Sequence, residues 1–394
     1  MTRISTVGFQ TNVVNQLDAL QSALAQTQSQ LSTGTKLQSS ADDPAGFAQV
    51  NEYNVQLSAS QQYVTNQNAA TANLNLESQA LSDATNLLQS ARDLAVEVNN
   101  SALSAAQRGN IAVQLQQQLQ QLVAIGNRTD SNGNYLFSGY DATTQPFAQV
   151  GNAVAYSGSS SVRSLQVSAN QLISGGDTGD SVFMNVPAGN GTFTTAVAAG
   201  NTGSASIDPG TVTNAAAWVP DTYTIAFTSP TQYQVTNSLG AVVTSGTYTA
   251  GATVAFNGVQ VTISGTPATG DQFTVAPAGK ASVFSTLSGL VNTLNSTTNP
   301  AQLTTQIGGA LKQIDNALTN FSGVSASVGS RINSISSAQT SEQAAQTNLQ
   351  GAISQLSDVD YAKATTQLST EELALQAAEQ SYASLAKLSL FNYV

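Results

Sequence analysis

Residues 39–46 read Ser-Ser-Ala-Asp-Asp-Pro-Ala-Gly, and this stretch decides where the main helix of the chain begins. Proline is favoured at the first helical position because its fixed φ suits the helix and its missing N–H has no partner there. An aspartate directly before the proline can accept hydrogen bonds from the free N–H groups of the first turn. We therefore predict a helix that starts at Pro44, with Asp43 as its N-cap.

The helix that follows is predicted to extend to about residue 99, because apolar residues recur in it every seven positions. They form two series, first Val50, Leu57 and Val64 and then Leu74, Leu81 and Leu88, and the second series falls at the d positions of the first. In a coiled coil two positions of every seven form the apolar seam that packs against the partner helix. We take Ser78, Thr85 and Arg92 as the second position of this seam, and because they are polar the sequence predicts a weak coiled coil. About 55 helical residues would span roughly 80 Å, which indicates a rod rather than a compact domain.

The two ends of the chain each carry an apolar stripe at helical spacing. The first helix is predicted to stop before Gly34, a residue suited to the left-handed turn after a helix. The stripes consist of Val13, Leu17, Leu20, Leu24 and Leu31, and of Leu368, Leu375, Tyr382, Leu385 and Leu388. Because an apolar stripe must be buried, we predict that these residues form an assembly interface with each other and with neighbouring copies.

The middle of the chain changes from helical to β composition. A third helix is predicted to begin near Ser104 and to end before a turn at 130–134. Alternating strands are predicted at 222–227, 232–236, 253–256, 259–263 and 272–275, with hairpin turns at 237–240 and 257–258. Short strands at this spacing favour a sandwich- or barrel-like domain. No pattern assigns structure to residues 175–215.

The fold class is predicted to be mainly α with an inserted β domain. Two helical arms that flank a β-rich insert must meet in space, so both termini are predicted to form a long antiparallel helical bundle or coiled coil. We predict an inner terminal domain from 1–43 and 350–394, and a helical rod domain from 44–150 and 281–349. Residues 151–280 would form a β-rich domain that projects outward.

Composition argues against several classes of function. The chain has 394 residues, no His and no Cys, so the commonest general base and all thiolate chemistry are missing. Only 11 residues are basic and the net charge is −11, which disfavours nucleic-acid binding. No segment reaches the apolar length of a membrane span, and the start lacks the apolar stretch of a signal peptide. We predict no enzyme, no catalytic residue, no cofactor, no metal and no membrane insertion.

Acidic residues do not form a convincing catalytic or metal site. The pairs Asp42-Asp43, Asp358/Asp360 and Glu371-Glu372 are too close in sequence to face one another on a helix, and capping explains them better. The turn at 130–134 lacks the closing glutamate of a calcium loop. Residues 177–180 are interpreted as a surface turn in preference to a cation site.

Segments at both ends of the chain resemble the flagellin superfamily. Residues 31–34 (Leu-Ser-Thr-Gly) with 40–46 resemble its N-terminal signature, and residues 354–364 with the final stripe resemble its C-terminal signature. The segment 134–140 is similar to hook-associated members of the family, whereas 40–46 is closer to filament flagellin. The family-signature residues are Asp42, Asp43, Pro44, Tyr135, Leu136, Phe137, Ser138, Gly139 and Tyr140.

This resemblance implies an extracellular structural subunit of the bacterial flagellum that joins the hook to the filament and templates flagellin polymerisation. Its partners would be further copies in a homo-oligomeric ring of an axial tube, a neighbouring hook-associated protein, and flagellin. An export chaperone and the type III export apparatus would deliver it without a cleaved signal peptide. Terminal segments would order only when neighbours supply the other face of each stripe. Filament flagellin is the alternative, followed by a secreted adhesin with a helical stalk.

Overall fold

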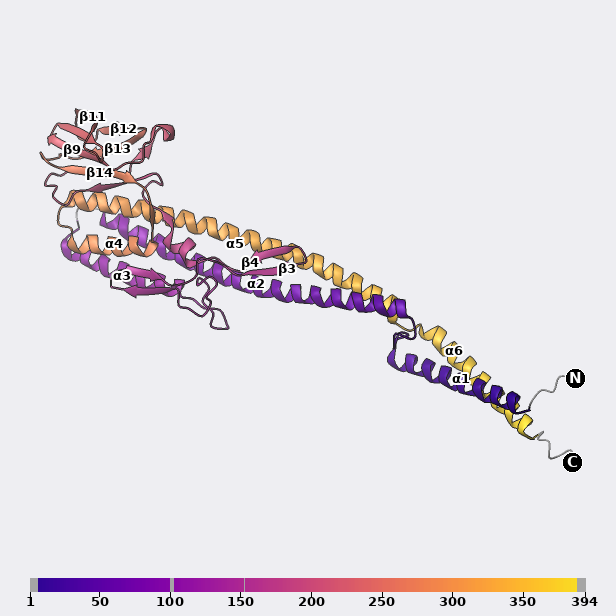
Figure 1. The fold of residues 1–394 in the computed structure, drawn as a ribbon. Helices are drawn as coiled ribbons and strands as arrows, with labels where there is room; N and C mark the ends of the chain where they lie inside the picture. Colours follow the sequence, from indigo (N-terminus) through magenta and orange to yellow (C-terminus); the bar gives the residue numbers. More distant parts are fainter. Residues whose placement is uncertain (1–5, 100–102, 152, 388–394) are drawn as a thin grey trace. The chain divides into compact units, whose positions relative to one another are not determined.

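A computed structural model describes residues 6–99, 103–151 and 153–387, which form long helices and a β-rich part that follows the third helix and precedes the fourth in the sequence (Figure 1). The helices are α1 (Thr6–Thr33), α2 (Pro44–Val98), α3 (Ala105–Gly126), α4 (Val283–Ser296), α5 (Pro300–Ser357) and α6 (Tyr361–Lys387). The predicted fold class, mainly α with an inserted β part, is confirmed. None of the described helices is both long and apolar enough to cross a lipid bilayer.

The chain forms two compact units. Unit 1 comprises residues 1–65 and 339–394, and unit 2 comprises residues 66–338. In unit 1, α1 and α6 pack side by side and run antiparallel (Figure 1). The helical pairing of the two ends therefore agrees with the sequence analysis, while the division into three domains stays a prediction.

The predicted boundaries of α1 and α2 are confirmed. Gly34 follows the last residue of α1 with a φ of +73°, in the left-handed region that glycine enters without a steric penalty. Helix α2 begins at Pro44. The Asp43 carboxylate accepts from the backbone N–H groups of Ala45 at 3.1 Å and Gly46 at 3.0 Å, so it caps the helix.

The seam of α2 in unit 2 is stronger than the sequence analysis predicted. The positions that alternate with Leu74, Leu81 and Leu88 lie three residues after each leucine, and they are buried, whereas Ser78 is exposed. The buried residues of α2 in unit 2 that follow a three–four spacing are Gln67, Ala70, Leu74, Glu77, Leu81, Ala84, Leu88, Ala91, Ala95 and Val98, and Ala80 is buried beside them. The assignment of Ser78, Thr85 and Arg92 to the seam was therefore wrong, and the true seam keeps an unbroken three–four spacing.

Helices α2 to α5 share one core in unit 2. Helix α3 starts with a capping box, in which Ser104 and Gln107 satisfy each other's backbone N–H groups. Leucines from α2, α3 and α4 meet isoleucines of α5 in this core, and a group of rings closes one part of it. The rings belong to Phe137, Phe147, Tyr156, Phe183, Phe284 and Phe321.

The larger sheets of the β-rich part lie beside the beginning of α5, whereas residues 164–174 lie beside α2 (Figure 1). Its strands are β1 (Phe147–Val150), β2 (Ala153–Tyr156), β3 (Ser164–Ser168), β4 (Gln171–Ser174), β5 (Val186–Pro187), β6 (Phe193–Val197), β7 (Ser206–Ile207), β8 (Thr211–Val212), β9 (Tyr223–Ser229), β10 (Gln232–Thr236), β11 (Val242–Thr247), β12 (Thr253–Phe256), β13 (Val259–Ser264), β14 (Gln272–Pro277) and β15 (Lys280–Ala281). A five-stranded sheet in the order β11-β10-β9-β14-β6 and a four-stranded sheet containing β12-β13-β7 share a second core. Both sheets are open, so the arrangement is a sandwich rather than a barrel.

The predicted hairpins are present. Strands β10 and β11 flank the turn at 237–240, and β12 and β13 flank Asn257 and Gly258. Both residues of the second turn have positive φ, +43° and +72°, as a two-residue hairpin of this type requires.

Residues 175–215, which the sequence left unassigned, form a π-helix, η1 (Asp180–Met184), and short strands. Side chains of α5 hold two of these strands. The Ile207 N–H donates to the Thr305 hydroxyl at 3.1 Å, and the Asn316 amide donates to the Pro187 carbonyl at 2.9 Å. Because these partners lie some hundred residues away in the chain, local sequence patterns do not specify this segment.

Candidate assembly surface

The two apolar stripes face each other only in part. Among the described side chains, Val13, Leu17, Leu20, Leu24 and Leu31 on α1, and Leu368, Leu375 and Tyr382 on α6, are each half-buried. Leu385 belongs to α6, and Leu388 lies outside the described residues. The packing of α1 against α6 therefore leaves apolar area uncovered along both helices.

Unit 1 has no apolar core of its own within the described residues. Its buried residues there are Thr27, Gly46, Ser60 and Ala364, which are all small or polar. In unit 2, by contrast, several large side chains, among them Leu74, Phe137 and Tyr223, are almost completely enclosed. Since burial of large apolar side chains is the main stabilising term in folding, unit 1 gains little of it within one chain.

Further exposed apolar residues lie on helices of unit 1 outside the predicted stripes. Leu373 on α6 is 68% exposed, Val55 on α2 is 70% exposed, and Val14 on α1 is 40% exposed. Sequence reasoning missed them because they lie off the predicted stripes. They are recognised only in the structure, where large apolar side chains left exposed on a helix mark a surface for a partner.

The two family-signature segments at the ends of the chain meet in unit 1. The Val359 N–H donates to the Gly34 carbonyl at 2.9 Å, and the Lys36 N–H donates to the Ser357 carbonyl at 2.7 Å. The Lys36 ammonium also donates to the Gln355 carbonyl at 3.0 Å. The break between α1 and α2 is therefore bonded directly to the break between α5 and α6.

Asp42 organises the loop before α2. One carboxylate oxygen accepts from the N–H groups of Gln38 at 3.0 Å and Ser39 at 2.8 Å, and the other accepts from the Gln26 amide at 2.8 Å. The hydrogen bonds from the Ser39 and Gln38 backbone lower the pKa of Asp42. Asp42 thus fastens the loop to α1, and Asp43 beside it caps α2.

The signature segment 135–140 lies in unit 2, so the structure does not bring it into the same unit as Asp42, Asp43 and Pro44. Phe137 is fully buried and meets Phe183 edge-on, with ring centroids 5.1 Å apart. Gly139 has a φ of +68°, and a Cβ there would lie 2.5 Å from the Ser159 carbonyl oxygen. The motif therefore closes one part of the helical core, and Tyr140, at 64% exposed, is its outward-facing ring.

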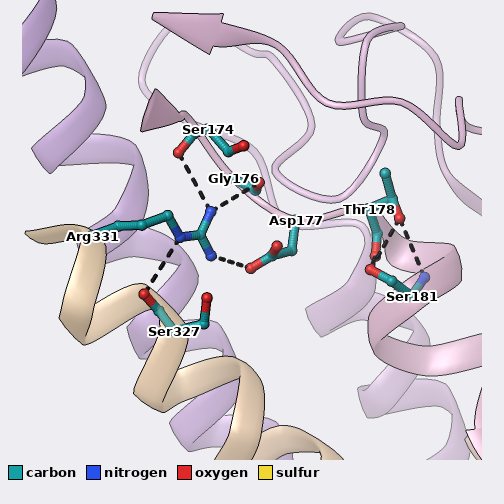
Figure 2. A network of polar contacts seen from close by, with 7 residues as sticks. All are labelled: Ser174, Gly176, Asp177, Thr178, Ser181, Ser327 and Arg331. Carbon is teal, nitrogen blue, oxygen red and sulfur yellow. Dashed lines mark hydrogen bonds and ion pairs between the residues drawn. The ribbon is translucent and has the colours of Figure 1, made fainter. Parts of the chain in front are cut away.

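Two acidic positions differ from each other in how well they were predicted. Asp360 caps α6 by accepting from the Lys363 N–H at 3.1 Å, in agreement with the capping interpretation. Residues 177–180 are not a surface turn: Thr178 is buried, and Asp177 forms an ion pair with Arg331 of α5 (Figure 2). The sequence could not indicate this ion pair, because Arg331 lies on a helix more than 150 residues further along the chain.

Sequence reasoning also missed Glu77, which occupies one of the seam positions of α2 and is 1% exposed. Burial, followed by the nearby Asp177 carboxylate, raises its pKa to about 9. The sequence did contain one signal for this residue, because a glutamate stands at a position where the helical spacing predicts a buried apolar side chain. Among the described residues, no group of three or more carboxylates is arranged to hold a metal ion.

Three family models match the chain. The N-terminal helical region of bacterial flagellin matches residues 4–142, and the C-terminal helical region of bacterial flagellin matches residues 311–394. A D2-like domain of flagellar hook-associated protein 1 matches residues 196–277. The first two matches contain the signature segments and both stripes.

Individual proteins are similar over long stretches. Flagellar hook-associated protein 3 of Escherichia coli is 32% identical over 157 residues, which cover 40% of this chain and 49% of that protein, so the match spans about half of the relative's length. The structure of hook-associated protein 3 from Legionella pneumophila is 33% identical with a TM-score of 0.75 and covers 78% of this chain and 98% of that one. The flagellar junction protein FlgL from the same organism is 32% identical with a TM-score of 0.71, with coverages of 79% and 100%.

Proposed function

The chain belongs to the flagellin superfamily and, within it, to the flagellar hook-associated protein 3 family, and on this premise we propose that it is a structural subunit that joins the flagellar hook to the filament. Its role is mechanical and involves no catalysis. It binds further copies of itself through unit 1 and offers flagellin a surface on which polymerisation begins.

The observation that carries this proposal is the incomplete burial of unit 1. Its stripes are half-buried when α1 and α6 pack together, and its buried residues within the described part are small or polar. Such a surface is stabilised when a neighbouring subunit covers it, because each square ångström of apolar surface removed from water contributes about 25 cal/mol. Neighbouring copies with the same stripes are the natural partners for the uncovered faces.

Folding coupled to assembly follows from the same feature. Helices that bury little apolar surface alone gain most of their stability from a partner, so α1 and α6 become fully ordered in the assembled ring. The low charge of the chain, 8% of residues, reduces repulsion between closely packed copies. We place this subunit in an axial tube between another hook-associated protein and flagellin.

The delivery route is a further part of the proposal. A chain with weakly stabilised ends suits passage through a narrow channel in an unfolded state, followed by folding at the assembly site. We propose export by the flagellar type III apparatus, with a chaperone covering the apolar stripes beforehand.

Deletion of the gene in its native bacterium tests the proposed role. Electron microscopy of the cells and blotting of the medium for flagellin are done on the same culture. We expect bare hooks together with unpolymerised flagellin in the medium, because flagellin would be exported without the subunit on which it assembles.

Two other outcomes would overturn the proposal. Loss of filaments without flagellin in cells or medium would mean that the chain is filament flagellin. Intact filaments on motile cells would exclude both flagellar roles and would favour an adhesin, which would keep its ligand binding after removal of its terminal helices.

A further inference from the structure

A cleft of about 610 Å³ lies within unit 2, between α2 and two loop segments. One wall comes from the signature segment that contains Tyr135 and Tyr140, and another comes from residues 162–165 and 175–177. Helix α2 contributes Asn73 and Glu77. The cleft thus brings together a core position of α2 and a loop that follows β4, a hundred residues apart in sequence.

Glu77 is buried in the wall of this cleft. Neither of its carboxyl oxygens has a hydrogen-bond partner at close range, and the Asp177 backbone, which lowers the pKa of Glu77, is the smallest influence on it. Gly176 lies over it, since a Cβ on Gly176 would be 3.5 Å from Oε2 of Glu77. The backbone of the loop therefore covers the carboxyl group and separates it from water.

The positive charge of Arg331 lowers the pKa of Glu77 and so opposes part of the upward shift. The hydrogen bonds of Arg331 shown in Figure 2 go to groups of the loop and of α5. Its Nη1 donates to the carbonyls of Ser174 at 3.4 Å and Gly176 at 3.1 Å, and Nη2 donates to the Asp177 carboxylate. Its Nε donates to the Ser327 carbonyl at 3.5 Å. The Arg331 side chain is 15% exposed, so Arg331 and Asp177 form a shielded, charge-assisted link between α5 and the loop.

The charge balance of this cluster favours a proton on Glu77. Asp177 forms an ion pair with Arg331, and a buried negative charge on Glu77 beside it would be both desolvated and repelled by the Asp177 carboxylate. Burial is the larger cause and Asp177 the next, and together they raise the pKa of Glu77 to about 9. The other ionisable residues of the cleft are Asp130, Tyr135, Tyr140 and Arg163. Asp130 accepts from the N–H groups of Asn132 and Asn134.

We propose that Glu77, Asp177 and Arg331 form a proton-dependent clasp, in which neutral Glu77 allows the loop at 174–177 to close over α2 and ionised Glu77 opens it. Arg331 holds the loop to α5 at every pH of the range in which Glu77 titrates. The contact between the loop and α2 depends on the proton on Glu77, because this proton removes the negative charge that the closed loop would otherwise bury.

The direction of the pH dependence follows from the raised pKa. Between the ordinary pKa of 4.5 and about 9, the closed state retains the proton whereas the open state loses it. Stability of the closed state is therefore greatest at acid pH and falls as pH rises through this range. One such group changes the opening equilibrium by up to about tenfold per pH unit.

Hydrogen exchange of the full-length chain tests the clasp, with wild type compared with Glu77→Gln at the same pH. Glutamine keeps the size and removes the titration. Residue 77 is remote in sequence from 174–177, so intrinsic exchange rates of the loop are the same in both proteins. Glu97→Gln is the matched control, because Glu97 is an exposed glutamate on the same helix.

From pH 6 to pH 8 the ratio of loop exchange in wild type to that in Glu77→Gln is expected to rise, by up to about tenfold per unit. The ratio of wild type to Glu97→Gln should stay constant. A constant ratio to Glu77→Gln would overturn the proposal.

Infrared spectroscopy provides a second readout that needs no stable variant. The carbonyl stretch of a protonated carboxyl group is expected in wild type at pH 7 and should disappear as the pH passes the raised pKa. In Glu77→Gln, if it folds, this band should be missing at pH 7. A wild-type spectrum that shows only ionised carboxylates at pH 7 would overturn the clasp.

Discussion

Asp43 shows how much one side chain contributes to the start of a long helix. Its carboxylate accepts from the N–H groups of Ala45 and Gly46, so Asp43→Ala leaves both donors without that partner. We expect a loss of about 1 kcal/mol in the stability of the first turn, measured as faster hydrogen exchange at residues 45–46. Asp43→Asn retains an acceptor and serves as the control. Equal exchange in Asp43→Ala and wild type would contradict the capping role.

Phe137 and Tyr140 belong to one signature motif but have opposite surroundings. Phe137 is fully buried among other rings, whereas Tyr140 is 64% exposed. Phe137→Ala is expected to lower the free energy of unfolding by about 3–5 kcal/mol, because it leaves a cavity and removes aromatic contacts. Tyr140→Ala should change it by less than about 1 kcal/mol. Urea denaturation compares the two, and similar losses would show that the motif does not act through Phe137.

The role of a single residue was predicted correctly where the groups that it contacts are near in sequence, and was missed where they are distant. The roles of Asp43, Pro44 and Gly34 depend on backbone groups within a few positions, so the sequence specifies them. The state of Glu77 depends on Asp177 and Arg331, which lie one hundred and 254 positions away. Local sequence patterns carry no direct information on such a cluster, although an acidic residue at a seam position could have been noticed.

At the scale of elements, the seam of α2 illustrates the same division. The recurrence of Leu74, Leu81 and Leu88 predicted a packed helix, but the phase of the alternate positions could not be fixed without knowing which helices surround it. The structure places Ala84 and Ala91 there, and small residues at these positions let neighbouring helices approach closely. Helix existence was therefore predicted correctly and its packing strength was underestimated.

The junction between α1 and α2 depends on Gly34. Besides its positive φ, an added Cβ would lie 3.1 Å from the Tyr361 hydroxyl oxygen. Gly34→Ala is expected to cost about 1–2 kcal/mol from the left-handed backbone, plus crowding against Tyr361. This cost is measured by monitoring the thermal unfolding of α1 and α6 through hydrogen exchange of their backbone amides.

The double variant Gly34→Ala with Tyr361→Phe separates the two causes. Removal of the hydroxyl group should relieve the crowding but leave the backbone strain, so the double variant should recover only part of the loss. Full wild-type stability in Gly34→Ala alone would contradict the assigned conformation.

At the scale of the whole molecule, the two units differ in how they obtain their stability. Unit 2 encloses two apolar cores within one chain, while the described part of unit 1 buries only small or polar residues. Limited proteolysis of the purified monomer should therefore cut first within α1 and α6 and leave unit 2 resistant. Terminal helices that resist the protease as well as unit 2 does would contradict this account.

The stripes themselves could be predicted from the sequence, since helical spacing exposes them directly. Their incomplete burial could not, because it depends on which surfaces of α1 and α6 meet. The family-level function rests on both pieces of information: the motifs identify the superfamily, and the half-buried stripes in unit 1 indicate where copies of the subunit would meet.

The central claim is that unit 1 joins subunits through these stripes, and complementation of the deletion strain with Leu24→Gln/Leu375→Gln tests it most directly. Glutamine preserves helix propensity while it removes apolar surface. Leu239→Gln is the control, because Leu239 is 89% exposed in a turn of the β-rich part. The account predicts that the control restores filaments, whereas the double variant is exported but leaves bare hooks and free flagellin. Normal filaments on cells that carry the double variant would contradict it.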